Sequence, residues 1–343
     1  MKRWKFISLF MMTLLSYCFL SPVGAGEKRV VRDMVGREVA LHPGAERIIT
    51  TFKPAALCVL SLGLSDRLVG IDSHSKHDKL QLGVYPGIAD LPGVGRKSTG
   101  LNLETIINLK PDLVVLYAQK DGIKIADRLV KHDIPALVIL PESFDGLKQA
   151  LVLMAEAAGE PERAEKVLTA CDRLLDIVSE RIRDIPENKR KVVYYASSKG
   201  VFSTATGSLL QDEIIGRAGG VNAGHALSGY FREISPEQFI KWDPDLIVSS
   251  IHGRVQVKRT LSRPEFKQVK GVAGGQVFLF PSNLAPWDFP SPLSTLGVLW
   301  LGKRLYPDRF EDIDLMSEID RFHQDLFKKT FTDMEGELKD RLQ

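Results

Sequence analysis

The chain has 343 residues, of which 44% are hydrophobic and 26% are charged, and its formal net charge is +3. This composition is typical of a soluble globular protein with material for about two domains. The charge is small for this length and the sequence has no basic block, so nucleic acid is excluded as the expected partner.

The first 25 residues have the three-part layout of a secretory signal peptide. Basic residues at positions 2, 3 and 5 precede an apolar run from Phe6 to Leu20, and Val23-Gly24-Ala25 offers a cleavage site. The run is short for a membrane span, which needs about 20 residues. Tyr17 stands where a lipoprotein signal would place a small residue before Cys18. We therefore expect cleavage and no lipid anchor.

Strands and helices are predicted to alternate through the first half of the mature chain. A hairpin at 30–41 comes first, and a helix begins at Pro54 and ends at Gly63. Further strands are expected at 47–52, 68–72, 112–117 and 136–140, and further helices at 104–109 and 123–132. Alternation of this kind predicts a parallel sheet with helices on both faces.

The middle of the chain is predicted to be helical. A helix is expected at 146–158, and a longer amphipathic helix at 162–183 has one apolar stripe. Its length and its position between the two halves favour a connector packed across the back of two lobes. An ordinary domain helix is the alternative interpretation.

The second half repeats the alternation. Strands are expected at 192–196, 245–250 and 276–281, and helices at 209–218, 293–305 and 313–326. The charged final dozen residues are expected to fray. Cys58 and Cys171 lie in apolar helical patterns, which predicts buried free thiols rather than a disulfide.

One segment occurs twice, at 103–115 and at 236–248. In both copies an acid, Glu104 or Glu237, opens a short helix, and a Pro-Asp pair separates that helix from an apolar run. The pattern predicts a helix followed by a buried strand once in each half, and hence two related lobes. The cleft between two lobes is where a small ligand usually binds.

Candidate binding residues follow from the rule that ligands lie beyond the carboxyl ends of parallel strands. Aromatic faces offer contact area and cations pair with acidic groups, so the residue types favour a bulky ligand with acidic or metal-chelating groups. The expected ligand contacts are Phe52, Lys53, Tyr117, Gln119, Tyr195, Arg232, His252, Arg254 and Trp287. The proline-rich loop 283–292 presents Trp287 and Phe289; burial of both rings in the core is the alternative.

No motif for catalysis is found. The sequence lacks a Walker pattern, a dinucleotide fingerprint, a Gly-x-Ser-x-Gly elbow and a Cys-x-x-Cys pair. His74 and His77 could bind a bare metal ion only if the fold brings further ligands such as His252 or Asp288 to them. We expect no enzyme activity, no cofactor and no metal site.

Several segments, read together, resemble the periplasmic substrate-binding proteins of ABC importers for iron–siderophore complexes, cobalamin and haem. They are residues 31–39, 47–49 with 62–72, 102–104 with 109–114, 218–222 and 235–237. The resemblance implies an α/β fold of two Rossmann-like lobes with parallel sheets, joined by a single long backbone helix. The implied division is a signal peptide at 1–25, an N-terminal lobe at 26–160, a connector helix at 161–185 and a C-terminal lobe at 186–343.

The resemblance also implies a function. A monomer in the periplasm would capture a ligand in the cleft and deliver it to an ABC permease and its ATPase. Glu104 and Glu237 match the acids that dock onto permease arginines in this family, although an acid in the first turn also stabilises a helix by about 0.3–1 kcal/mol. Trp287 falls where family members often place an aromatic ring against the ligand.

The ligand is expected to be a metal chelate, with a ferric siderophore as the leading candidate. Cobalamin, haem and molybdate or tungstate are alternatives, because residues 286–292 resemble a subgroup that includes oxyanion binders. The chain has no obvious set of three arginines of the kind used for anionic siderophores. A tetrapyrrole-handling enzyme or chelatase, and a bare-metal receptor, are the alternatives from other classes.

Overall fold

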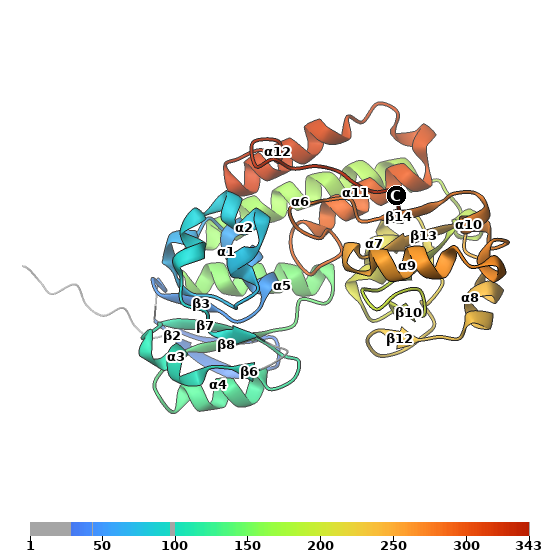
Figure 1. Ribbon diagram of the computed structural model, residues 1–343. Helices are drawn as coiled ribbons and strands as arrows, with labels where there is room; N and C mark the ends of the chain where they lie inside the picture. Colours follow the sequence, from blue (N-terminus) through green and yellow to red (C-terminus); the bar gives the residue numbers. More distant parts are fainter. Residues whose placement is uncertain (1–28, 43, 97–99, 343) are drawn as a thin grey trace, which may run out of the picture.

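Two four-stranded parallel sheets form the centres of two lobes (Figure 1). The computed structural model describes residues 29–42, 44–96 and 100–342. The predicted signal peptide lies outside these residues. The α/β fold class expected from the sequence is confirmed.

The N lobe contains the first sheet, whose strands run in the order β4-β3-β7-β8. Its strands are β3 (Ile48–Thr50), β4 (Leu68–Gly70), β7 (Leu113–Tyr117) and β8 (Ala136–Ile139). Its helices are α1 (Lys53–Ser61), α2 (Lys79–Val84), α3 (Leu103–Asn108), α4 (Gly122–Val130) and α5 (Phe144–Ala157). Every residue of β7 and β8 is buried, as expected for strands that helices cover on both faces.

Two short antiparallel pairs accompany this sheet. The predicted hairpin is confirmed as β1 (Arg29–Arg32) paired with β2 (Glu38–Leu41). The second pair joins β5 (Gly95–Arg96) to β6 (Gly100–Leu101).

The C lobe contains the second sheet, in the order β11-β9-β13-β14. Its strands are β9 (Val192–Ala196), β11 (Val221–Asn222), β13 (Leu246–Ser249) and β14 (Val277–Leu279). Its helices are α7 (Leu210–Arg217), α8 (Pro236–Trp242), α9 (Arg254–Leu261) and α10 (Lys270–Ala273). A small ribbon pairs β10 (Ser203–Thr204) with β12 (Arg232–Glu233).

The repeated segment forms the same unit in both lobes. Helix α3 leads into β7, and helix α8 leads into β13. Both helices are capped by a polar side chain: Asn102 accepts from the amide of Thr105 at 3.0 Å, and Ser235 accepts from that of Gln238 at 3.2 Å. Each cap satisfies an amide that the first helical turn leaves without a partner.

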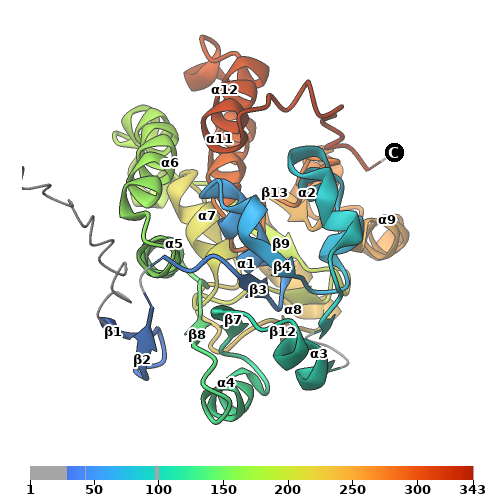
Figure 2. The ribbon, with the colours of Figure 1, turned by 90° about the vertical axis from the view of Figure 1, so that its left-hand side faces the viewer.

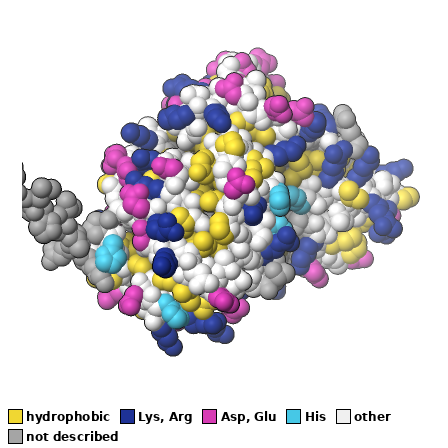
Figure 3. Space-filling view, turned by 60° about the vertical axis from the view of Figure 1, so that its left-hand side comes forward, with side chains coloured by type: hydrophobic (Ala, Val, Ile, Leu, Met, Phe, Trp, Pro, Cys, Tyr) yellow, Lys and Arg dark blue, Asp and Glu magenta, His cyan; other side chains and the backbone are white. Residues whose placement is uncertain are grey.

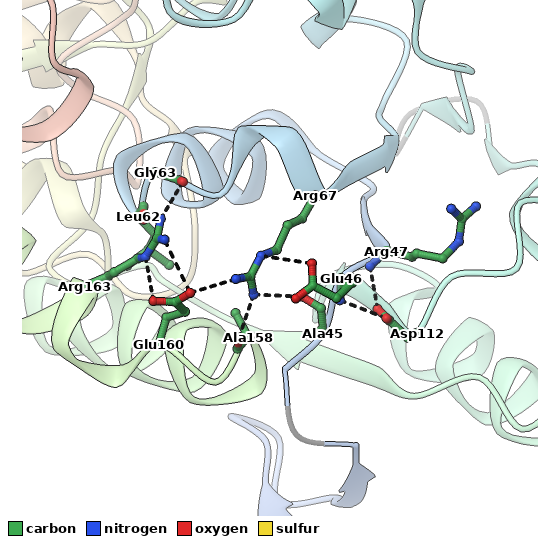
Figure 4. A network of polar contacts seen from close by, with 10 residues as sticks. All are labelled: Ala45, Glu46, Arg47, Leu62, Gly63, Arg67, Asp112, Ala158, Glu160 and Arg163. Atoms are coloured by element: carbon green, nitrogen blue, oxygen red, sulfur yellow. Dashed lines mark hydrogen bonds and ion pairs between the residues drawn. The ribbon is translucent and has the colours of Figure 1, made fainter. Parts of the chain in front are cut away.

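The aspartate of each Pro-Asp pair joins its strand to the neighbouring one. Asp112 accepts from the amides of Glu46 and Arg47, both at 2.9 Å (Figure 4). Asp245 accepts from the amide of Val192 at 2.8 Å. The repeat therefore encodes both the end of a helix and the alignment of two central strands.

The long helix α6 (Pro161–Ile182) packs against both lobes. It lies against α5 of the N lobe and against α7, α11 (Ser294–Leu305) and α12 (Leu315–Phe327). Figures 1 and 2 both show α6, α11 and α12 on one side of the molecule, with α3 and α8 on the opposite side. The buried stripe of α6 consists of Ala164, Val167, Ala170, Cys171, Leu174, Val178 and Ile182.

A polar network fixes the start of α6 to the N lobe (Figure 4). Arg67 donates to the carbonyl of Ala158 and to the carboxylate of Glu160, both at 2.7 Å. Arg163 donates to the carbonyl of Gly63 at 2.6 Å and to Glu160 at 3.0 Å. Because these bonds connect the segments that follow α1 and α5 to the helix, the start of α6 is held to the N lobe.

Residues 332–342 pack against the C lobe, so the prediction of a frayed end is wrong for this described part of the tail. The amide of Leu279 in β14 donates to the carbonyl of Asp340 at 2.8 Å, and Phe331 is fully buried. Lys329 donates to the carbonyl of Gly83 in the N lobe at 2.6 Å. The tail is retained because its backbone pairs with the open edge of β14 and its apolar side chains are buried, while its charges remain at the surface.

The two cysteines and the surface charges agree with the sequence. Cys58 and Cys171 are free and buried, as predicted, and burial raises the pKa of Cys171 to about 12. Acidic and basic side chains are interspersed over the N lobe in Figure 3, which agrees with the small net charge. In the part of the chain that the structure describes, no helix is both long and apolar enough to cross a membrane.

Candidate ligand-binding site

A cleft of about 800 Å3 lies between the two lobes. Central strands of both sheets lead to it: Phe52 follows β3, Tyr117 ends β7, Tyr195 lies near the end of β9, and Ser250 follows β13. The cleft therefore occupies the carboxyl ends of the parallel strands, where the sequence analysis places the ligand.

Aromatic rings line both sides of the cleft. On the N-lobe side, the ring centres of Phe52 and Tyr117 are 4.8 Å apart. On the C-lobe side, Tyr195 stacks on Phe231 with ring centres 6.1 Å apart, and Phe231 is 43% exposed. Such faces offer a large apolar contact area to a ligand.

A lysine and an aspartate form an ion pair in the cleft wall. Lys53 is the first residue of α1, and Asp78 is the N-terminal cap of α2. Lys53 Nζ lies 2.5 Å from Asp78 Oδ2, and the two side chains are 19% and 7% exposed. Lys53 Nζ also lies 5.7 Å from the ring centre of Phe289, so this side chain contacts both lobes.

Three histidines face the same space. His74 and His77 come from the N lobe, and His252 comes from the C lobe, where its ring centre is 6.2 Å from that of Phe289. However, the described residues contain no group of three or more His, Cys, Asp or Glu side chains that could hold a metal ion. The bare-metal alternative, which requires such convergence, gains no support.

A buried carboxylate lies beside the C-lobe wall of the cleft. Tyr195 Oη donates to Asp288 Oδ2 at 2.6 Å, and Gln211 Nε2 donates to the backbone carbonyl of Asp288 at 2.8 Å. Burial raises the pKa of Asp288, an effect opposed by Tyr195, His252 and Ser250. Burial also raises the pKa of Tyr195, so the shared proton stays on the phenol.

Another buried aspartate shapes the histidine loop. Asp72 accepts from Ser75 Oγ at 2.5 Å and from the backbone amide of His74 at 3.1 Å. These bonds fold residues 72–78 into a tight turn, which brings His74, His77 and Asp78 to the same wall. Burial raises the pKa of the Asp72 carboxyl group, against the lowering effect of these bonds.

Most of the residues expected to contact the ligand lie in the cleft. Those that line it are Phe52, Lys53, Tyr117, Gln119, Tyr195 and His252. Gln119 Nε2 donates to Tyr117 Oη at 2.8 Å, which orients both side chains. Whether these residues bind a ligand stays a prediction.

Three of the expected residues are not among those that line the cleft. Trp287 is fully buried and packs on Phe331, with ring centres 6.4 Å apart, because the large indole gains more by burial in the core. Arg232 lies on the exposed ribbon strand β12, and Arg254 begins α9 on the surface. Exposure is the usual state of an arginine side chain.

Sequence reasoning missed several residues of the cleft. Phe231 lies in no distinctive sequence pattern. Phe289 is predicted only as part of the loop that also presents Trp287. The sequence could have predicted Asp78 as the N-terminal cap of a helix, because aspartate is a preferred capping residue. The ion pair with Lys53 could not be read from the sequence.

The two acids of the repeat are exposed at the first turns of α3 and α8. These helices lie on the side of the molecule opposite α12 (Figure 1). The amide of Glu237 itself and the hydroxyl of Ser235 lower the pKa of the Glu237 carboxyl group. It is therefore ionised at neutral pH and available to a basic partner.

Comparisons with known proteins agree with this arrangement. The model of the periplasmic binding protein family matches residues 48–284. The molybdate-binding protein MolA of Haemophilus influenzae is 25% identical over 93% of this chain and 97% of its own length. The Fe(3+)-citrate-binding protein YfmC of Bacillus subtilis is 27% identical over 74% of this chain and 78% of its own. The solved structure of MolA bound to molybdate superposes with a TM-score of 0.77 at 23% identity, over 88% of this chain and 98% of that one.

Proposed function

The chain belongs to the periplasmic binding protein family, and we propose that it captures a bulky metal chelate, with a ferric siderophore as the leading candidate. The chelate would bind in the cleft between the lobes. The observation that carries this proposal is the cleft itself, which combines a volume of about 800 Å3 with aromatic side chains from both lobes. Membership of the family makes the chain a binding protein of an ABC importer and not an enzyme.

The size of the cleft favours a chelate over a bare oxyanion. Drug-sized ligands occupy pockets of about 300–1,000 Å3. A tetrahedral oxyanion would fill a small part of the cleft and would not contact Phe52, Phe231 and Phe289 together. Cobalamin and haem also need a wide aromatic cleft and remain candidates of the same kind.

Molybdate is the second candidate, because the relative MolA binds it. An oxyanion site needs a compact set of hydrogen-bond donors. His74, His77 and His252 could supply some of these donors if the lobes close further around a small ligand. The relative named for Fe(3+)-citrate supports a chelate instead.

The proposal includes the delivery of the ligand. A monomer, released into the periplasm after removal of residues 1–25, would dock on an ABC permease that works with an ATPase. Glu104 and Glu237 would be the docking acids, since both are exposed in equivalent positions of the two lobes.

Calorimetry with a ligand panel tests the proposal. The panel contains uncharged and anionic ferric chelates, cyanocobalamin, haem and molybdate. We expect at least one ferric chelate to bind and to raise the melting temperature. Binding of molybdate alone would favour the second candidate, and an unchanged melting temperature with every ligand would contradict the proposed function.

A further inference from the structure

We propose that the cleft takes metal chelates without net negative charge, and that Asp78 sets this preference by holding Lys53 in an internal ion pair. The proposal rests on the proposed function and narrows it to one charge class of chelate. The sequence alone predicts a different role for Lys53, in which its ammonium group pairs with the ligand.

The charged side chains of the cleft compensate one another. Among the described residues that line it, the ammonium groups are those of Lys53 and Lys120, and the carboxyl groups are those of Asp72, Asp78 and Glu142. No described lining residue is an arginine. An anionic ligand would therefore find no excess of fixed positive charge.

The position of Lys53 makes its ammonium group hard to recruit. The pair with Asp78 is short, at 2.5 Å, and both side chains are largely buried. Asp78 is held in place by a second bond, because its Oδ1 accepts from the amide of Gln81 at 3.1 Å as the cap of α2. Separating a largely buried ion pair leaves an uncompensated charge, which is costly.

The ammonium group of Lys120 does not replace that of Lys53, because the Lys120 side chain is exposed to solvent. Water and salt screen the interactions of an exposed charge. An anionic ligand that entered the cleft would lose hydration while it faced the carboxylate of Asp78. An uncharged ligand would pay no such cost and would still gain the contacts with Phe231 and the other rings.

Ferric siderophores of different net charge can test this preference for uncharged ligands. Three hydroxamate groups cancel the charge of the ferric ion, so a ferric tris-hydroxamate such as ferrichrome is uncharged. Three catecholate groups exceed that charge, so ferric enterobactin is anionic. Both complexes are bulky, and they differ mainly in charge and in the metal-binding groups.

The decisive variant is Asp78→Asn. Asparagine is as good a helix cap as aspartate, so α2 keeps its first turn while Lys53 is released from its partner. We expect the ratio of affinities, anionic chelate over uncharged chelate, to rise about tenfold or more in calorimetry, a change that corresponds to about 1.4 kcal/mol. In the double variant Lys53→Met, Asp78→Asn the gain should disappear, because it acts through the ammonium group.

The matched control is Asp314→Asn, which changes the capping aspartate of α12 outside the cleft and should leave the ratio unchanged. An unchanged ratio in Asp78→Asn, or a wild-type preference for the anionic chelate, would overturn the charge preference but not the proposed function. If wild type binds no chelate at all, the proposed function fails and this inference fails with it. A thermal melt of each variant shows whether it is folded.

Discussion

At the scale of single residues, the cleft wall depends on a buried carboxyl group that does not itself line the cleft. Asp288 is fully buried and accepts a hydrogen bond from the phenol of Tyr195, whose ring lines the cleft. Its other oxygen, Oδ1, is buried without a hydrogen-bond partner among the described residues. The carboxyl group therefore positions Tyr195 at the cost of desolvating a group that prefers to be charged.

The raised pKa of Asp288 predicts a pH dependence of stability. A raised folded-state pKa means that the folded protein holds the proton more tightly than the unfolded chain. The stabilising contribution is therefore complete below the ordinary pKa of aspartate, about 3.9, and is lost as the pH rises through the raised value. The variant Asp288→Asn cannot titrate, so its stability relative to wild type should increase with pH.

Urea unfolding of both proteins between about pH 4 and about pH 8 measures this trend. Asp314→Asn is the control, because the Ser317 hydroxyl lowers the pKa of Asp314. The contribution of Asp314 is lost only as the pH falls below the ordinary pKa of aspartate, so the stability of this variant relative to wild type should stay nearly constant over the measured range. A difference between Asp288→Asn and wild type that stays constant with pH would contradict the assigned role of burial.

Trp287 and Phe289 show where sequence reasoning about the site ends. Both rings belong to one stiff loop, and either could reach the cleft. The structure buries Trp287 against the C-terminal tail and leaves Phe289 between Lys53 and His252. That choice depends on Phe331, more than forty residues away, and no local pattern contains it.

At the scale of secondary-structure elements, the sequence predicts the structure better than it does at the scale of single residues. The repeated segment predicted α3 before β7 and α8 before β13, and the structure confirms both units. Local signals determine these elements: a capping side chain, an acid in the first turn, a Pro-Asp stop and an apolar run. The helices α9 and α10 were missed, because their short and strongly charged or Gly-containing sequences have little apolar periodicity.

The equivalence of α3 and α8 leads to a prediction about docking. The double variant Glu104→Lys, Glu237→Lys should abolish uptake of the ligand by cells, because two cations would face the arginines that the proposed docking assigns to the permease. Ligand affinity in calorimetry should stay intact, since neither acid lines the cleft.

A matched control reverses Asp172 and Glu180, two exposed acids of α6 on the opposite side of the molecule. This control should transport normally. Unimpaired uptake by the first variant, or a loss of its ligand affinity, would count against the docking role.

At the scale of the whole molecule, two long segments contact both lobes, in addition to local contacts such as those of Lys53 with Phe289 and of Phe144 with Glu213. The first is α6, which the sequence predicted. The second is the segment 328–342, which begins beside the N lobe at Lys329 and ends along β14 of the C lobe at Asp340. Pairing with a distant strand edge is a long-range property, so the charged composition of this segment gave no sign of it.

The second connection should limit how far the lobes separate. Removal of residues 329–343 deletes the bond to Gly83, the buried ring of Phe331 and the pairing with β14. It leaves α6, the packing of α12 on α1, and the bond from Phe144 to Glu213. We expect a broader distribution of inter-lobe distances and a lower melting temperature.

Pulsed electron paramagnetic resonance measures the inter-lobe distance between spin labels attached to Ile123→Cys in α4 and Val255→Cys in α9. Both positions are exposed, at 40% and 73%, whereas the native Cys58 and Cys171 are buried and should not take up the label. The point variant Phe331→Ala, which keeps the tail but removes its buried anchor, should cost about 3–5 kcal/mol and broaden the distribution less. If the shortened chain is folded and its distances match those of the full chain, the remaining contacts fix the lobes and the tail is not a restraint.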